Sequence, residues 1–298
     1  MKLTLRQLEV FLAIAHFENV TLAVNSLALS QSAASTALKE LEHRFGISLF
    51  DRIGKRLQLN ELGQRVRPRA EALLDQAGEF ERNLTSIEDV GAIKVGATLT
   101  IGNYLAVGII ARFMSLHPES RIDLIVENTR AIAARIHNFE LDVGLIEGEL
   151  QDPELEVLPW RDDELTLFCA PDHPFARKQT LSDEDLLCAK WIVRETGSGT
   201  RQAFDRAMTG LLSNLDLLLE LQHTEGIKRA VEANLGIGCL SRITLEEAFR
   251  RGSLVPLEAP HRNWQRKFYF IMHRQKFRTS GIDSWLALCR DIQTAEIK

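Results

Sequence analysis

The stretch 27-LALSQSAASTALKELEHRFGISLFDRIGKRLQLN-60 decides the fold of the N-terminal part. From Ser32 to Phe45 its apolar residues recur at helical spacing, about 100° per residue, and form one stripe along a helix. We expect this stripe to pack against the domain; it consists of Ala34, Leu38, Leu41 and Phe45. The outward face carries Ser32, Thr36, Lys39, Glu40 and His43, with Ser35 at its edge.

The outward face of this helix is unusual near its start, because short hydroxyl side chains stand where a solvated helix usually has Glu or Lys. Such side chains weaken a helix interior, but they let the helix approach the floor of the DNA major groove, which is about 12 Å wide. Gln31 adds an amide that can donate and accept hydrogen bonds. A serine-rich N-cap on an ordinary surface helix is the alternative interpretation.

The residues after this helix predict a basic hairpin. Leu57 and Leu59 alternate with polar residues around Gly54, which is typical of two short strands joined by a turn. A cationic hairpin beside a groove-entering helix can hold DNA phosphates while the helix contacts base edges. We therefore predict DNA contacts from Gln31, Ser32, Ser35, Thr36, Lys39, Arg52, Lys55 and Arg56.

Two further helices are predicted before this stretch. The first ends around residues 18–19, and Thr21 can cap a second, short helix that runs to about Ala28. The first is amphipathic, with apolar residues at steps of three to four: Leu5, Leu8, Phe11, Leu12 and Ala15.

The charged residues are distributed unevenly along the chain, which the net charge alone does not show. The net charge of the 298 residues is −5, with 36 Lys and Arg against 41 Asp and Glu. Residues 1–60 carry 7 basic and 5 acidic side chains, a net of +2, so the remainder carries 29 against 36, a net of −7. The two parts therefore need different partners, and only the first suits a polyanion.

Composition is that of an ordinary globular protein, with 45% hydrophobic and 26% charged residues. The N-terminus lacks a secretory signal pattern and no run of 18 apolar residues occurs, so we expect a cytoplasmic protein without a membrane partner. The cysteines show neither CxxC spacing nor nearby histidines, so we expect free, mostly buried thiols and no metal site: Cys169, Cys188, Cys239 and Cys289.

The segment after the hairpin predicts a long paired helix. Asn60 can cap it, and Pro68 is expected to kink it or delay its start. Its apolar residues alternate in steps of four and three, which is the seam of two paired helices, although packing against its own domain is the alternative. These residues are Val66, Ala70, Leu73, Ala77, Phe80, Leu84 and Ile87.

From Ile93 onward, apolar strands alternate with helical patterns, which predicts a parallel, doubly wound α/β sheet. The first set is "IKVGATL", a helix to 117–118, "RIDLIVEN", a helix from Thr129, and "LDVGLIEG". A second set contains "ELTLFCA", "KWIVRETGSGTRQAF" and "LDLLLELQHTEGIKRAVEANLGIGCLS", and "KFYFIMHR" precedes a last helix.

The N-terminal run resembles the winged helix-turn-helix of LysR-type transcriptional regulators, in its SQxAxS start, the LE near the helix end, LF-R before the wing and N-x-x-G after it. Ser32 stands where the family often has Pro, and Thr36 where it often has Arg; both bear on base preference. The resemblance implies an N-terminal winged helix-turn-helix, all-α with a small β wing, plus an α/β two-lobed sensor resembling type 2 periplasmic binding proteins.

The same resemblance implies a domain order. Residues 1–60 form the DNA-binding domain, 61–90 the dimerising linker helix and 91–298 the effector-binding domain. Within the last, lobe I comprises 91–160 and 266–298, and lobe II 161–265. Paired linkers would place two recognition helices on halves of a promoter site about one DNA turn apart, in a homodimer or homotetramer.

The expected ligand site lies between the lobes, where strand ends lead into helices. Thr98 and Thr100 end the first strand before a helix expected near 102–103, and Glu147 could hold an amine, orient water or pair with Arg194. Helix N-termini and small residues favour an anion. His223 starts a further helix, as a cap or as a contact. The predicted ligand residues are Thr98, Thr100, Ile101, Glu147, Arg194, Ser198, Gly199, Thr200 and His223.

More narrowly, "TIGNYL", "IEG", "RETGSGTR", "AVEANLGIGCLSR" and "HRQK" resemble a branch of regulators of sulfur metabolism. That resemblance implies a small-molecule effector, such as sulfite or sulfate, and no cofactor. No catalytic residues are predicted, because the chain lacks a P-loop ending, GxSxG and HExxH. A solute-binding protein for a small anion is the alternative function.

Overall fold

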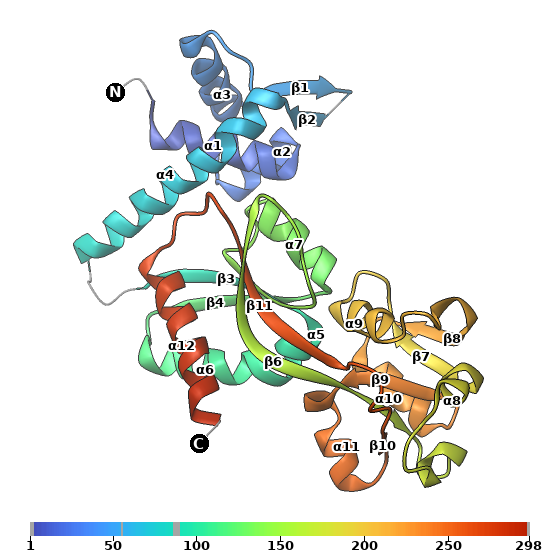
Figure 1. The fold of residues 1–298 in the computed structure, drawn as a ribbon. Helices are drawn as coiled ribbons and strands as arrows, with labels where there is room; N and C mark the ends of the chain where they lie inside the picture. Colours follow the sequence, from blue (N-terminus) through green and yellow to red (C-terminus); the bar gives the residue numbers. More distant parts are fainter. Residues whose placement is uncertain (1–2, 55, 86–89, 297–298) are drawn as a thin grey trace. The chain divides into compact units, whose positions relative to one another are not determined.

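The computed structural model describes residues 3–54, 56–85 and 90–296 (Figure 1). It divides into two compact units. The first contains Met1–Gly91 with Arg274–Asp283, and the second contains Ala92–His273 with Ser284–Lys298.

The N-terminal unit begins with short helices and a hairpin: α1 (Leu5–Phe17), α2 (Val20–Ser26), α3 (Gln31–Phe45), β1 (Phe50–Ile53) and β2 (Arg56–Leu59). Side chains cap each helix start. Thr4 and Gln7 form a capping box on α1, and Ser30 Oγ accepts from Ala33 N at the start of α3. The shared core includes Leu8, Phe11, Leu38 and Leu41. The winged helix-turn-helix is therefore confirmed.

Two local predictions in this unit are wrong. Asn19, not Thr21, caps α2, because its Oδ1 accepts from the backbone N–H groups of Thr21 and Leu22. Phe45 does not complete the packing stripe of α3 and is 49% exposed. It is the last residue of the helix, which ends at the left-handed Gly46, so its side chain lies beyond the core that holds Leu41.

Helix α4 (Glu61–Thr85) follows the hairpin, and Asn60 Oδ1 accepts from Gly63 N at its start, as predicted. Pro68 lies inside the helix and does not delay its start. Further along, Leu73, Phe80 and Leu84 are 47%, 65% and 71% exposed. Ile87 lies outside the described residues.

The inner side of α4 is held within its own unit. Val66, Ala70 and Leu74 pack against the N-terminal core. The segment Arg274–Asp283 belongs to the same unit, where Lys276 Nζ lies 2.9 Å from Asp75 and Ser280 N donates to Glu79 over 2.8 Å.

Over the residues that the structure describes, the second unit is built on a nine-stranded sheet in the order β4-β3-β5-β11-β6-β9-β7-β8, with β10 paired to β6. Parallel pairing joins β3 to β4 and β5 in lobe I, and β7 to β8 and β9 in lobe II. The strands are β3 (Ala92–Ala97), β4 (Arg121–Val126), β5 (Val143–Glu147), β6 (Leu155–Cys169), β7 (Lys190–Arg194), β8 (Asp216–Leu221), β9 (Ile237–Ser241), β10 (Val255–Leu257) and β11 (Gln265–His273).

Helices cover both parts of this sheet (Figure 1). They are α5 (Leu99–Ile101), a π-helical turn (Gly102–Ala106), α6 (Val107–Leu116), α7 (Thr129–His137), α8 (Asp183–Cys188), α9 (Gly199–Ala207), α10 (Thr224–Glu232), α11 (Glu246–Arg251) and α12 (Ser280–Glu296). The helix expected near residues 102–103 thus begins at Leu99, with Thr98 at its N-cap.

Two long antiparallel strands, β6 and β11, run from one lobe into the other (Figure 1). Sequence alternation alone predicted a parallel sheet, and these strands are the departure from it. Their register shifts between Phe268 and Tyr269, which pair with Arg161 and Pro159 and leave Trp160 as the bulged residue. The Trp160 ring stacks on Phe270, with centroids 5.1 Å apart.

The cysteines are free, and Cys169, Cys239 and Cys289 are buried while Cys188 is exposed. One helical run of the described chain, Leu99–Leu116, is long and apolar enough to cross a membrane by length and composition. In the fold this run packs Ile101, Ile109 and Phe113 into the interior of the sensor.

Candidate functional site

The predicted DNA-binding residues of α3 lie along its outward side. Gln31, Ser32, Thr36 and Lys39 are exposed and Ser35 is half-buried, while Ala34, Leu38 and Leu41 pack inward. Ser32 Oγ lies 3.0 Å from the capping Ser30 Oγ, so this hydroxyl already takes part in the helix start.

The hairpin carries two of the three predicted wing cations on its paired strands. Arg52 and Arg56 are exposed on β1 and β2, one register step apart, since Arg52 pairs with Leu57 and Ile53 pairs with Arg56. Gly54 makes the turn with φ of 62°, a conformation that side chains other than glycine rarely adopt. Lys55 lies outside the described residues.

In the sensor, several predicted ligand residues meet in a buried group that we name the hinge cluster: Thr100, Glu147, Asp163, Thr200 and Arg266. The Glu147 carboxylate accepts from Thr100 N over 3.2 Å and from Thr200 Oγ1 over 2.6 Å. It also forms an ion pair with Arg266. Thr100 belongs to lobe I and Thr200 to lobe II, so this carboxylate joins the lobes.

Arg266 is the centre of charge in the hinge cluster. Its Nε lies 2.6 Å from Asp163, and its Nη1 donates to Thr200 Oγ1 over 3.0 Å. Ser241 Oγ donates to the other Asp163 oxygen over 2.7 Å. Burial raises the pKa of Glu147, but the charge of Arg266 and the hydrogen bonds from Thr200 and Thr100 outweigh it and lower this pKa to about 2. Glu147 is therefore ionised in the folded protein.

Arg194 does not pair with Glu147. Its guanidinium instead donates to both carboxylate oxygens of Glu195, at 2.8 and 3.0 Å, with the arginine side chain 1% exposed. Arg194 pairs with Glu195, its neighbour in sequence, and Glu147 pairs with Arg266 of the hinge strand β11. The suggested pairing of Glu147 with Arg194 is thus wrong.

A cavity of about 380 Å³, the cleft cavity, lies between the lobes. Three helix starts meet at it: Leu99 begins the run to Leu116, Asn128 is the N-cap of α7, and His223 is the N-cap of α10. Each helix start carries roughly half a positive charge. The lining residues are Leu99, Asn103, Val126, Glu127, Asn128, Ala131, Glu195, Gln222 and His223.

The two acids of the cleft cavity are already paired. Glu127 accepts from Arg135 at 2.8 Å, and this bonding holds the pKa of Glu127 below its usual value. Glu195 binds Arg194 and accepts from Asn128 Nδ2 over 3.1 Å, which links the lobes beside the cavity. Their charges are therefore largely balanced.

Two buried hydroxyls flank the lining of the cleft cavity. Thr98 directly precedes Leu99 and is 2% exposed, and Thr224 directly follows His223 and is 3% exposed. Among the described residues neither Thr98 Oγ1 nor Thr224 Oγ1 has a hydrogen-bond partner. Leaving a buried hydroxyl without a hydrogen-bond partner costs about 1–3 kcal/mol of folding free energy, so a ligand that supplies the partner would be stabilised there. His223, meanwhile, makes no side-chain cap on α10 and lines the cavity instead.

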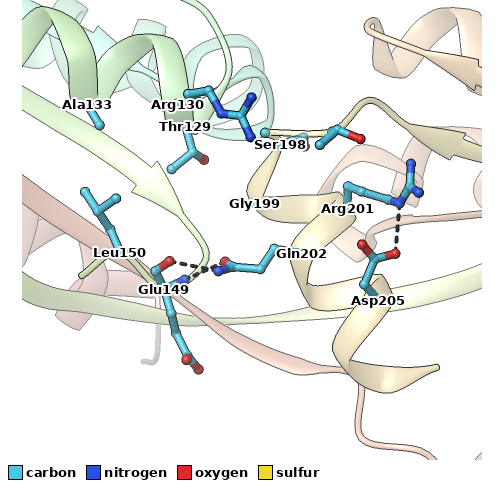
Figure 2. Close-up of a pocket in the computed structure, with 12 residues that line it drawn as sticks. Thr129, Arg130, Ala133, Glu149, Leu150, Ser198, Gly199, Arg201, Gln202 and Asp205 are labelled. Atoms are coloured by element: carbon cyan, nitrogen blue, oxygen red, sulfur yellow. Dashed lines mark hydrogen bonds and ion pairs between the residues drawn. The ribbon is translucent and has the colours of Figure 1, made fainter. Parts of the chain in front are cut away.

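A second cavity of about 430 Å³, the Arg130 cavity, is also lined by residues of both lobes. Figure 2 shows Arg130 above it, Gln202 hydrogen-bonded to Glu149, and Arg201 in an ion pair with Asp205. The predicted residues Ser198 and Gly199 line this cavity rather than the cleft cavity. Ser198 Oγ accepts from Thr200 N, so it acts as a helix cap.

The predicted ligand residues other than Arg194 fall into three places. Thr100, Glu147 and Thr200 belong to the hinge cluster, and Ile101 is fully buried; Ser198 and Gly199 line the Arg130 cavity; His223 lines the cleft cavity, and Thr98 directly precedes its lining residue Leu99. Sequence reasoning missed Arg266, Asp163, Asn128 and Gln222. Asn128 had a signal, because it precedes the helix expected from Thr129 and asparagine is a favoured N-cap.

An interlobe contact lies at Tyr104, which the π-helical turn carries. Its hydroxyl donates to Glu225 over 2.9 Å and accepts from Lys228 Nζ over 3.1 Å. Burial raises the pKa of Tyr104, and the hydrogen bond from Lys228 opposes that rise. Lys228 also donates to Thr244 O within lobe II, so the contact is anchored on that side.

The chain matches two family models. Residues 5–64 match the bacterial regulatory helix-turn-helix protein, lysR family, and residues 87–293 match the LysR substrate binding domain. It is 42% identical over 289 residues to the HTH-type transcriptional regulator YeiE of Escherichia coli, covering 97% of this chain and 98% of YeiE. It is 28% identical over 266 residues to CysL of Bacillus subtilis, covering 89% of each.

A full-length OxyR structure from Pseudomonas aeruginosa has the same fold, with a TM-score of 0.74 and 20% identity over 98% of this chain and 94% of that one. A solute-binding protein is not favoured, because the matched helix-turn-helix at residues 5–64 has no place in one. The chain belongs to the LysR family, whose members are ligand-responsive DNA-binding regulators of transcription.

Proposed function

We propose that this regulator senses a small anion in the cleft cavity, and that a sulfur oxyanion such as sulfite or sulfate is the effector. The observation that carries the proposal is the meeting of three helix starts at a cavity flanked by two unpaired buried hydroxyls, Thr98 and Thr224. Helix starts stabilise anions through their free N–H groups and their dipoles.

The polar lining suits an oxyanion. Three lining residues have side chains able to donate hydrogen bonds: Asn103, Gln222 and His223. Glu127 is paired with Arg135 and Glu195 with Arg194, which limits the repulsion of a bound anion by these two carboxylates. A volume of about 380 Å³ leaves room for bound waters beside the anion. The effector acts by its difference in affinity between two arrangements of the lobes.

On DNA, the outward face of α3 reads base edges and Arg52, Lys55 and Arg56 hold phosphates. The exposed Leu73, Phe80 and Leu84 of α4 support pairing of two linker helices, and two such dimers form a tetramer in the cytoplasm. No step of this function requires catalysis.

Thermal unfolding of the full-length protein tests the effector. Sulfite, sulfate, phosphate and chloride are compared at equal ionic strength, and a binding anion raises the melting temperature because it binds only the folded form. Thr98→Val with Thr224→Val is expected to remove the shift, whereas the exposed Thr209→Val leaves it unchanged. If no anion exceeds chloride, the effector is not one of these anions.

A further inference from the structure

The hinge cluster has the form of an oxyanion site that is already filled. The Glu147 carboxylate receives a backbone N–H from the start of one helical run (Thr100), a hydroxyl from the start of another (Thr200), and a guanidinium from the strand between the lobes (Arg266). A free oxyanion would be bound by the same three kinds of donor. Here the acceptor is covalently part of the chain.

The donors come from different parts of the sensor. Thr100 follows β3 in lobe I, Thr200 lies in the first turn of α9 in lobe II, and Arg266 lies on β11. Glu147 itself ends β5 of lobe I and is 1% exposed. The Glu147 main chain adds two contacts, since its carbonyl accepts from Thr129 Oγ1 over 2.9 Å and abuts Gly199 of α9.

The charge of the cluster argues that no second anion shares this space. Two carboxylates, Glu147 and Asp163, face one guanidinium, and all three side chains are at most 2% exposed. An added anion would increase the excess negative charge where water screens it little. The hinge cluster and the cleft cavity therefore differ in their suitability for an anion, since only in the cleft cavity is each carboxylate paired with its own arginine.

We propose that Glu147 is a tethered anion: its carboxylate occupies an oxyanion cradle formed by both lobes, so the chain itself supplies the charge that joins them. Without this side chain the cradle would accept a small free carboxylate, such as acetate or formate. The proposal goes beyond the proposed effector and does not depend on it, because Thr100 N, Thr200 Oγ1 and Arg266 Nη1 all contact the Glu147 carboxylate without an effector.

Chemical rescue of the full-length protein tests the cradle. Glu147→Ala removes the carboxylate and the methylene beside it, which together match acetate in size. The melting temperature of this variant is expected to fall below that of the wild type and to recover saturably as acetate or formate replaces chloride at constant ionic strength. The wild type, whose cradle is full, is expected to show no such recovery.

Two matched variants separate rescue from a general salt effect. Glu147→Gln fills the space with a neutral amide and is expected to lose stability without rescue by acetate. Asp183→Ala removes a half-exposed carboxylate that pairs with Arg262, and it is also expected to show no rescue. Equal acetate effects on the wild type, Glu147→Gln and Glu147→Ala would overturn the proposal.

Should Glu147→Ala not fold, Thr200→Val provides the test, because it keeps the carboxylate and removes only the donor from lobe II. Hydrogen exchange is expected to accelerate about tenfold at the start of α9 and also at residues 99–101 of lobe I, because one charged acceptor joins both. Faster exchange confined to α9 would show a local cap and would contradict the interlobe role.

Discussion

At the scale of residues, Thr36 on α3 and Arg52 on the wing are expected to contribute to DNA binding in different ways. Thr36→Ala removes an exposed side chain that we propose faces base edges, so it is expected to change the preference at one base pair by about 1–3 kcal/mol. Arg52→Ala is expected to weaken every duplex and to reduce the slope of log affinity against log salt by about one.

Fluorescence anisotropy with promoter and scrambled duplexes at several salt concentrations measures both effects. Arg206→Ala, which removes an exposed arginine of the sensor, is the control and should leave the affinity unchanged. Equal losses from Thr36→Ala on all sequences would remove Thr36 from base reading.

Single residues also show where sequence reasoning stops. Of the predicted ligand residues Thr98, Thr100, Glu147 and Ser198 to Thr200, only Thr100, Glu147 and Thr200 come together, at strand ends and helix starts that can be read from local patterns. Its counter-charge, Arg266, lies 119 positions from Glu147, and no local pattern connects them. Pairing with Arg194, which ends a strand, was one of several roles open to Glu147 from the sequence, and the adjacent Glu195 binds the Arg194 guanidinium instead.

At the scale of elements, the start of α9 packs directly on the end of β5. A Cβ at Gly199 would lie 1.9 Å from the carbonyl oxygen of Glu147, which is main chain and cannot move aside cheaply. Gly199→Ala is therefore expected to push α9 away and to destabilise the sensor by about 1–3 kcal/mol. Urea denaturation measures the change.

Gly226→Ala is the matched control in α10. Its Cβ would meet only Leu221 Cδ1 at 3.7 Å, and alanine favours a helix over glycine by up to about 1 kcal/mol. This variant should be as stable as the wild type or more so. If both alanines have the same effect, the close approach of α9 and β5 does not limit the sensor.

The predicted elements were mostly correct in kind, because period and capping are local properties. The helix after β3 began earlier than expected, at Leu99, and the run continues through a π-helical turn; Thr98 holds the N-cap position without a side-chain hydrogen bond to the helix. The length of β6 was not foreseen either. Its 15 residues cross both lobes and show no single alternation, because each end is buried in a different core.

At the scale of the whole molecule, the proposed DNA reading depends on the pairing of two chains through α4. Phe80→Ser with Leu84→Ser removes two exposed apolar side chains of α4 and is expected to shift the protein toward monomers. Analytical ultracentrifugation measures the assembly, with the exposed pair Glu81→Ser and Asn83→Ser as control. An unchanged sedimentation coefficient in the apolar variant would exclude this helix seam.

The division of charge belongs to this scale as well. Residues 1–60 are net +2 and the rest net −7, so the sensor is repelled by the polyanion that the N-terminal unit binds. The two-part organisation could be predicted from this asymmetry together with the change from helical to alternating patterns. The meeting of Leu99, Asn128 and His223 at one cavity could not, since it depends on how two lobes close.

The path of β11 links the sensor to the N-terminal unit through the covalent chain. This strand carries Arg266 at the hinge, runs beside the bulge at Trp160 and ends at His273, after which the chain enters Arg274–Asp283. That segment contacts α4 through the Lys276–Asp75 ion pair and the hydrogen bond from Ser280 N to Glu79. The covalent chain therefore leads within a few residues from the end of β11 in the sensor to the contacts on the linker helix.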